Sequence, residues 1–160
     1  MHRTKNTLDA AKRGKSAVLL GTGLVHALDL ERHAKQAHWN VRGPNFKALH
    51  ELFDEVAQQS EDASDLLAER LVALGGTADG RVGVVASRST LPDYPADATS
   101  GDEHVEELSR SIAAFGSVAR DAIDQAAEWG DADTADVFTG VSRGLDKTLW
   151  LVEAHAGPYE

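Results

Sequence analysis

The segment from residue 49 to residue 70, LHELFDEVAQQSEDASDLLAER, has the repeat of an amphipathic helix. Its apolar side chains recur three and four positions apart, as they do on the buried face of a bundle helix. The repeat begins before this segment and continues beyond it until Gly75-Gly76 stops it. We therefore predict one long helix here, starting near Asn45. Its apolar face consists of Phe46, Leu49, Phe53, Val56, Leu67, Leu71 and Leu74.

Three further segments carry the same apolar repeat, and no stretch of the chain reads convincingly as a strand. One of them opens with SGDE (100–103), in which Glu103 follows Ser100 by three positions, as in a capping box. The sequence thus predicts four long helices. The limits of the other three are about Leu8 or later to about Asn40, Ser100 to Gly130, and about Asp133 to Gly157-Pro158.

The lengths of the connections predict how the helices are joined. A few residues join the first helix to the second and the third to the fourth, so each pair forms an antiparallel hairpin. The connection 76–100 is too long for a plain turn, so we expect it to cross the bundle with a short helix near RVGVVAS (81–87). The predicted fold class is all-α, a ferritin-like four-helix bundle with one long crossover that carries a short helix between helices two and three. Residues 1–160 are expected to form a single domain, with residues 1–8 as a short basic N-terminal arm.

The composition limits the chemistry open to the chain. There is no cysteine, so any metal ion must be held by nitrogen and oxygen atoms. The formal net charge of −10 argues against binding nucleic acid through the whole surface and favours attraction of cations. Basic residues are concentrated in the first fifteen positions, so only a short arm is suited to contact phosphate.

The stretch KRGKSAVLLGTGLVHA (12–27) imitates a signal peptide. Gly21 and Gly23 interrupt its apolar run, however, and the helical pattern continues into LDLERHAKQAHWN (28–40). We interpret the stretch as part of the first helix, in which the two glycines mark either close packing or a bend. No apolar run approaches the length of a membrane span, so the expected location is the cytoplasm.

Two pairs of candidate metal ligands lie on the helix that contains residues 49–70. His50 and Asp54 are four positions apart, as are Asp65 and Glu69, so each pair shares one helix face. Asp65 follows Asp54 by eleven positions, which is about 20° from three whole turns and keeps all four side chains on that face. The same spacing separates the pairs by about 16 Å along the axis. Because ligands lie about 2 Å from a metal ion, the two pairs cannot share an ion within one chain.

The two pairs can share an ion if a second copy of the helix packs antiparallel to the first. In such a pair the numbers of facing residues have a constant sum, and this sum is the same for His50 with Glu69 and for Asp54 with Asp65. Two equivalent sites would form per dimer across an ordinary twofold interface. The axis falls between Gln59 and Ser60. The small residues expected to allow close approach there are Ala57, Ser60, Ala63 and Ser64.

Other kinds of metal site fit the sequence less well. The segment HELFD (50–54) is not the H-E-x-x-H motif of zinc proteases, because Asp54 replaces the second histidine. No E-x-x-H motif occurs in the chain, so the di-iron site inside a single ferritin-type bundle is also missing. Acidic residues on a polar helix face are commonly no more than solvated, which is the structural alternative. If these residues do bind metal, the spacing favours a site between two bundles.

Three stretches give the sequence a family resemblance. AKQAHWNVRGPNFKALHELFDEVA (34–57), DLLAERLVALGG (65–76) and DADTADVFTGVSRGLDKTLWLVEAH (131–155) resemble the Dps family, the mini-ferritins named as DNA-binding proteins from starved cells. The resemblance covers nearly the whole chain and implies a homo-oligomeric shell of twelve four-helix bundles with a ferroxidase centre at each twofold interface. It also places the family's metal ligands. These are His38, His50 and Asp54 from one subunit and Asp65 and Glu69 from its partner.

The resemblance also implies an activity. Fe(II) would bind to the carboxylates and imidazoles, with Zn(II) as a competitor. Hydrogen peroxide would accept two electrons from paired irons, and the Fe(III) product would be stored as a mineral, which protects the cell from oxidative damage. Trp39 is expected either to take up stray oxidising equivalents or simply to pack. The acidic residues Asp131, Asp133 and Asp136 are expected either to line a pore for iron or to cap a helix.

The family name also points to DNA. DNA-binding members carry a longer, lysine-rich tail, whereas the basic arm is short here and the C-terminal GPYE has no basic residue. The alternative function is therefore a DNA-coating structural protein, associated with the nucleoid, in which iron chemistry is secondary. A ferritin-like bundle that binds zinc without turnover is a third reading.

Overall fold

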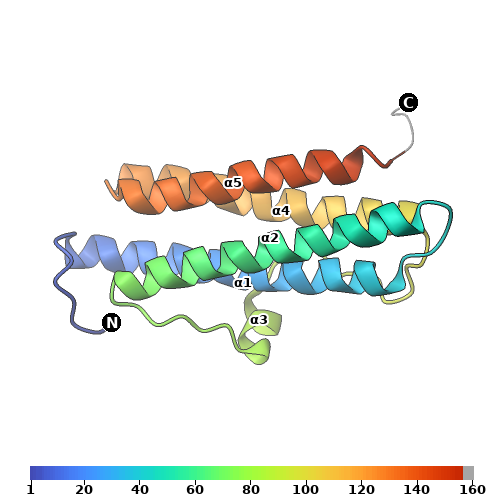
Figure 1. Cartoon of the computed structure of the whole chain (residues 1–160). Coiled ribbons are helices and arrows are strands. Elements are labelled where there is room, and N and C mark those ends of the chain that lie inside the picture. The colour runs from blue at the N-terminus through green and yellow to red at the C-terminus, as the bar shows by residue number, and fades with distance from the viewer. Residues whose placement is uncertain (157–160) are drawn as a thin grey trace.

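The computed structural model describes residues 1–156, and in that range the chain is helical without a named strand (Figure 1). The predicted long helices and the short crossover helix are all present. The end predicted at Gly157-Pro158 lies outside the described residues, and the last helix stops before it. The helices are α1 (Ala10–Asn40), α2 (Phe46–Ala73), α3 (Val82–Arg88), α4 (Gly101–Glu128) and α5 (Ala132–Glu153).

The four long helices form two antiparallel hairpins that pack side by side. Helix α2 folds back along α1, and α5 folds back along α4 (Figure 1). The connection from α2 to α4 runs the length of the bundle on the side of α1 and carries α3 about half-way. The prediction of a ferritin-like four-helix bundle with one long crossover is therefore confirmed. None of the described helices is both long enough and apolar enough to span a membrane.

Side chains fix the starts of α1 and α4. Asp9 accepts a hydrogen bond from the Ala11 amide at 2.9 Å and so caps α1. At the start of α4, the predicted capping box is present. The Ser100 hydroxyl accepts from the Glu103 amide at 3.2 Å, and the Glu103 carboxylate accepts from the Ser100 amide at 2.9 Å. Hydrogen bonds from the Ser100 and Thr99 backbones lower the pKa of Glu103 to about 2.

The core lies between the hairpins and is built around three phenylalanines. Phe53 of α2, Phe115 of α4 and Phe138 of α5 are each fully buried. Complete burial of such a side chain contributes about 1.5–3 kcal/mol relative to leaving it in water. The inner face of α2 matches the predicted stripe except for Phe46, which stays 44% exposed at the start of the helix. Packing of these faces is what brings the ends of α1 and α2 into a fixed arrangement.

The two glycines within α1 differ in their surroundings. A Cβ atom built on Gly23 would lie 2.8 Å from Cε1 of Phe138 and 3.2 Å from Cδ1 of Leu67, closer than packed atoms approach. A Cβ atom on Gly21 would lie 3.6 Å from Cδ1 of Leu71, which is ordinary contact. Gly23 therefore marks close packing of α1 against a buried ring, whereas the structure gives Gly21 no such constraint.

Replacing each glycine by alanine should change stability in opposite directions. Gly21→Ala should raise the free energy of unfolding by up to about 1 kcal/mol, because alanine favours a helix more than glycine does. Gly23→Ala should lower it by about 1–2 kcal/mol, because the overpacking penalty exceeds that gain. Urea denaturation of both variants at equal concentration measures the difference. Stabilisation by Gly23→Ala would show that the Phe138 ring moves aside freely.

Histidines hold the crossover against the bundle. His26 Nε2 lies 2.9 Å from the Thr90 hydroxyl, and the Tyr94 hydroxyl lies 2.8 Å from His104 Nδ1. The ring of His33 packs against Tyr94, with centroids 5.1 Å apart. All three histidines are buried. These contacts connect α1 and α4 through the segment that ends the crossover.

Burial lowers the pKa of both His33 and His104 below the usual 6.5, although Asp29 and Asp93 oppose the shift at His33 and Glu103 opposes it at His104. The unfolded chain therefore binds protons more readily than the native chain at these two positions. Stability contributed by the neutral rings is complete above about pH 6.5 and decreases as the pH falls below it. Chemical denaturation from about pH 7 to about pH 5 should show this decrease, with a shallower slope in His33→Gln. Equal slopes in the unchanged protein and in His33→Gln would show that His33 does not contribute to this pH dependence.

Candidate metal centre

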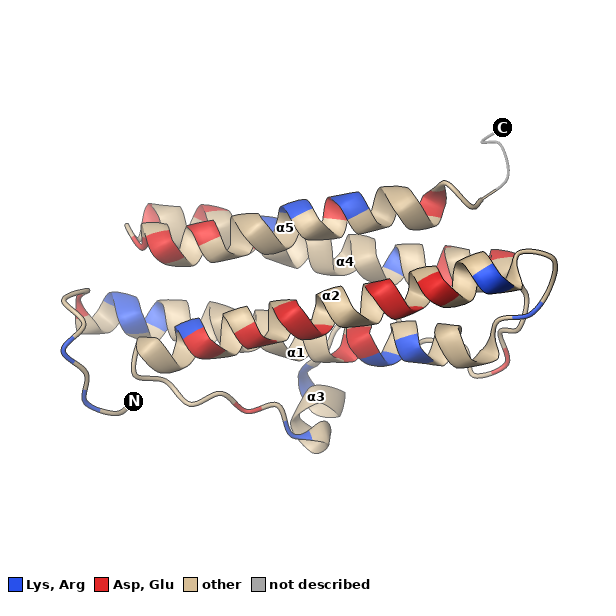
Figure 2. Cartoon of the chain, in the orientation of Figure 1, with Lys and Arg blue, Asp and Glu red and all other residues tan. Residues whose placement is uncertain are grey.

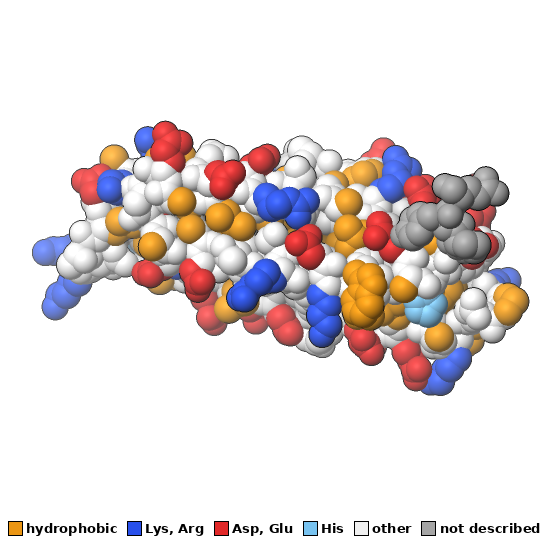
Figure 3. All heavy atoms as spheres, turned by 90° about the horizontal axis from the view of Figure 1, so that it is seen from above, with side chains coloured by type: hydrophobic (Ala, Val, Ile, Leu, Met, Phe, Trp, Pro, Cys, Tyr) orange, Lys and Arg blue, Asp and Glu red, His pale blue; other side chains and the backbone are white. Residues whose placement is uncertain are grey.

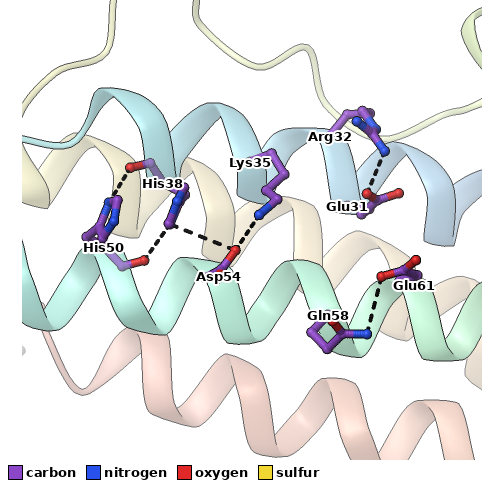
Figure 4. A network of polar contacts seen from close by, with 8 residues as sticks. All are labelled: Glu31, Arg32, Lys35, His38, His50, Asp54, Gln58 and Glu61. Atoms are coloured by element: carbon purple, nitrogen blue, oxygen red, sulfur yellow. Dashed lines mark hydrogen bonds and ion pairs between the residues drawn. The ribbon is translucent and has the colours of Figure 1, made fainter.

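The predicted ligands His38 and His50 meet where α1 ends and α2 begins. His38 lies in the last turn of α1, and the short connection 41–45 brings the first turns of α2 back beside it. The two rings stack with centroids 3.7 Å apart and an interplanar angle of 20°. His38 Nδ1 lies 2.7 Å from the carbonyl oxygen of His50, and His50 Nδ1 lies 2.8 Å from that of His38 (Figure 4). Each ring is thus held by the other residue's backbone.

These two hydrogen bonds fix which nitrogen remains available. A carbonyl oxygen only accepts, so Nδ1 of each ring must donate and carry the hydrogen. In the neutral imidazole the lone pair is then on Nε2. Hydrogen bonding of the other ring nitrogen to a carbonyl is the arrangement that orients histidines for metal binding. His38 and His50 therefore offer two oriented nitrogen donors.

Asp54 lies one turn after His50 on α2, beside the stacked rings. Its Oδ1 atom is 4.0 Å from His38 Nδ1 and forms an ion pair with Lys35 of α1 (Figure 4). The hydrogen bond from Lys35 is the main reason why the pKa of Asp54 lies below its usual value. Burial opposes this lowering slightly, and the charges of Lys35, His38 and His50 add to it. The side chain is 53% exposed, so an ionised carboxylate faces solvent next to the histidines.

Asp65 and Glu69 lie farther along α2 and are exposed. Acidic residues recur along this face of the helix (Figure 2). The structure therefore brings His38, His50 and Asp54 together and leaves the other two predicted ligands apart from them. Within residues 1–156, no three histidine or carboxylate side chains are placed to hold one ion. One folded chain presents two separate half-sets of donors.

The small residues of α2 do not lie where the sequence suggested. Ala57, Ser60, Ala63 and Ser64 were expected at a contact with a second copy, but all four are buried within their own bundle. The Ser60 hydroxyl donates to the Val56 carbonyl at 2.8 Å, which satisfies it inside the helix pair. Between the two half-sets of donors, the exposed side chains of α2 instead include Gln58 and Glu61. A partner helix would meet polar side chains near the axis.

Known proteins resemble this chain in both sequence and fold. The family model of the ferritin-like domain matches residues 20–159 of the sequence. A DNA protection during starvation protein of Agrobacterium fabrum is 42% identical over 154 residues, which cover 96% of this chain and 95% of that protein. The structure of Dps from Microbacterium arborescens in the high iron form is 37% identical, with a TM-score of 0.83 and coverage of 95% of this chain and 97% of that one. DpsC from Streptomyces coelicolor is 28% identical, with a TM-score of 0.92 and coverage of 99% and 94%.

The chain belongs to the Dps family. That membership confirms the resemblance, while the ligand set remains a prediction. Lys35, which pairs with the predicted ligand Asp54, was not predicted from the sequence. A signal was available, because Lys35 precedes His38 by three positions and so shares its helix face. Trp39, next to His38, is 65% exposed and does not pack in the core.

The three acidic residues at the start of α5 have different roles. Asp131 is buried, caps α5 and forms an ion pair with Arg70 of α2 at 2.7 Å. Burial alone would raise the pKa of Asp131. The Ser16 hydroxyl, the hydroxyl and amide of Thr134 and the charge of Arg70 together lower it instead. It is a structural cap and does not face solvent. Asp133 and Asp136 are exposed, so a pore role stays a prediction for them.

Removing the charge of Lys35 should strengthen binding of a divalent cation at this site. Lys35 pairs with Asp54 and also repels an approaching cation, so Lys35→Gln removes a competitor. We expect the affinity for Co(II), measured by its absorption, to rise roughly fivefold. Lys47→Gln is the matched control, because Lys47 pairs with Glu51 and contacts none of the predicted ligands. Equal effects of the two changes would attribute the gain to net charge alone.

Proposed function

We propose that this protein oxidises Fe(II) with hydrogen peroxide at sites between subunits and stores the Fe(III) product inside a shell of twelve identical chains. The observation that carries the proposal is the pair of backbone-held imidazoles beside Asp54. Two nitrogen donors and a carboxylate suit Fe(II), and Zn(II) would compete for the same groups. Bound iron here is the substrate of the reaction.

The site would be completed by a second copy of the chain. Because Asp65 and Glu69 are exposed on the same helix face as Asp54, an antiparallel copy of α2 can bring them opposite Asp54 and His50. The same register places Gln58 opposite Glu61 of the other copy. Within one chain, the Gln58 amide already donates a hydrogen bond of 3.2 Å to the Glu61 carboxylate. A polar stripe at the axis therefore supports the pairing.

The chemistry needs only binding and orientation from these residues. Two Fe(II) ions each give one electron to one hydrogen peroxide molecule, the O–O bond breaks, and two protons complete two molecules of water. The imidazoles and carboxylates hold the ions close together, so that both electrons are available at once. This pairing avoids release of hydroxyl radical.

Several features of the chain suit the handling of iron. Exposed Asp133 and Asp136 lie together at the start of α5, and the net charge of −10 attracts cations. The relative from Microbacterium arborescens was captured in a high iron form. These observations support iron as the cargo, which would protect the cell from peroxide and free Fe(II).

Mixing two inactive variants provides a sharp test of the shared site. His50→Ala damages one half-set and Glu69→Ala damages the other, and each variant alone should lose most peroxide-driven Fe(II) oxidation. In a mixed dimer, one site carries both changes and the other carries neither. Random reassembly should therefore restore activity at about a quarter of the sites. Stopped-flow absorption of Fe(III) in metal-stripped, reassembled protein measures it.

The control is a mixture of His50→Ala with Asp54→Asn, which damage the same half-set and should not complement each other. Recovery in that mixture would show that His50 and Asp54 of one site come from different chains, and no recovery in the first mixture would place the site within one chain. Metal binding without any Fe(II) oxidation by the unchanged protein would instead favour a protein that binds zinc without turnover.

The second candidate function is coating of DNA, which the names of the relatives favour. The only concentrated basic segment is the N-terminal arm, and it folds back on its own bundle. The His2 amide donates to the Gly75 carbonyl at 2.7 Å. On the face shown in Figure 3, basic side chains are interspersed with acidic and apolar ones. This surface offers little to a DNA backbone.

We therefore expect weak retention of DNA in a gel shift at physiological salt, because few phosphates can be neutralised. Deleting the residues before Leu8 should change little. A clear shift at that salt concentration, abolished by the deletion, would favour the DNA-coating function over the storage function.

A further inference from the structure

We propose that Tyr94 and His104 form an internal donor of one electron and one proton, which supplies the second electron when a site holds a single Fe(II). The inference rests on the proposed function for the source of the oxidant. Tyr94 lies near the end of the crossover, and His104 lies in the first turn of α4. Their pairing is the observation from which the argument starts.

The phenol and the imidazole are joined directly. The Tyr94 hydroxyl lies 2.8 Å from His104 Nδ1, and the two rings are nearly parallel at 16°. His104 is fully buried, and its Nε2 atom has no hydrogen-bond partner within residues 1–156. Burial lowers the pKa of His104 and, with Glu107, raises that of Tyr94, so the ground state is a neutral phenol and a neutral imidazole. In the tautomer with hydrogen on Nε2, the phenol donates and Nδ1 accepts.

This hydrogen bond makes oxidation of the phenol easier than it would be elsewhere in a protein interior. A phenol that loses an electron becomes a strong acid, and without a base nearby the resulting positive charge would remain on a partly buried ring. Here the proton moves to His104 Nδ1 as the electron leaves, which gives a neutral tyrosyl radical and an imidazolium. When the electron returns, the proton returns with it. Histidine is the side chain best suited to this exchange.

One aromatic contact joins the pair to α2, the helix that carries the predicted ligand Asp54. The ring of Phe53 contacts His104 edge-on with centroids 6.1 Å apart, and the rings of His104 and Tyr94 are 6.0 Å apart. Phe53 immediately precedes the predicted ligand Asp54 on α2. The donor pair is therefore in contact with the residue that adjoins the predicted ligand Asp54 in the chain.

The structure also suggests when a second donor is needed. Lys35 already neutralises Asp54, which reduces the negative charge available to hold a second cation. A site with one Fe(II) supplies one electron, whereas breaking the O–O bond of hydrogen peroxide to water requires two. The balanced step consumes one Fe(II), one Tyr94 phenol paired with neutral His104, one hydrogen peroxide and two protons from solvent. It yields Fe(III), the tyrosyl radical beside protonated His104 and two molecules of water, with no hydroxyl radical released.

The test uses assembled protein with one Fe(II) per site, mixed with excess peroxide and frozen for electron paramagnetic resonance. The expected signal is a tyrosyl radical whose hyperfine pattern changes with ring-deuterated tyrosine. It should be lost in Tyr94→Phe and kept in Tyr159→Phe, the matched control at the only other tyrosine of the sequence. His104→Gln, which keeps an acceptor but removes the base, should reduce the yield. A signal that persists in Tyr94→Phe, or that belongs to tryptophan alone, overturns the proposal.

A second arm needs no iron and separates this proposal from the proposed function. Metal-free protein is oxidised by one-electron oxidants generated in a radiolytic pulse, and tyrosyl absorption is followed. The unchanged protein and Tyr159→Phe should form the radical at Tyr94, and Tyr94→Phe should not. If Fe(II) oxidation fails while this radical forms, only the proposed function is rejected. If Tyr94→Phe leaves the absorption unchanged, the donor is rejected whatever the iron result.

Discussion

The arrangement of the candidate site depends on one constraint, the exchange of hydrogen bonds between two imidazoles and two backbone carbonyls at the corner between α1 and α2. His38 and His50 can form these bonds only if the last turn of α1 and the first turns of α2 face each other at close range. The buried stripes of the two helices impose that approach, so the geometry of the donors follows from core packing. A loosely packed hairpin would leave both rings free to rotate and either nitrogen free to carry the hydrogen.

Helix α2 has two faces with separate functions. Its inner face fills the core with Phe53 and the small residues that the sequence suggested for a subunit contact, and its outer face carries the acidic stripe. Because a helix is rigid over such a length, the core fixes the spacing of the outer residues. Because the two half-sets of donors are held apart on one helix, they cannot bind the same ion. An identical antiparallel helix from a second chain is the simplest way to complete both sites at once.

The sequence predicted the elements well because their signals are local. Apolar spacing, the Ser100–Glu103 capping box and glycine stops depend only on neighbouring residues, and they located the long helices and the short crossover helix. Which face of α2 carries the small residues was misjudged, because the core needs small side chains as much as an interface does. Lys35 and the exchange of hydrogen bonds between the histidines were missed for another reason. They are contacts across the α1–α2 corner, which no single helical repeat contains.

The interior beneath the crossover contains the buried polar side chains His26, His33 and His104. An unpaired buried nitrogen such as Nε2 of His104 costs about 1–3 kcal/mol, and an apolar residue of similar volume would avoid that cost. Tyr94 could be held equally well by packing alone, since His33 and His104 already place rings within about 6 Å of it. The phenol–imidazole hydrogen bond is therefore not needed to hold the crossover in its position. A group that has to give up and regain a proton at this position would use this bond, because the imidazole can hold the proton and return it to the same phenol.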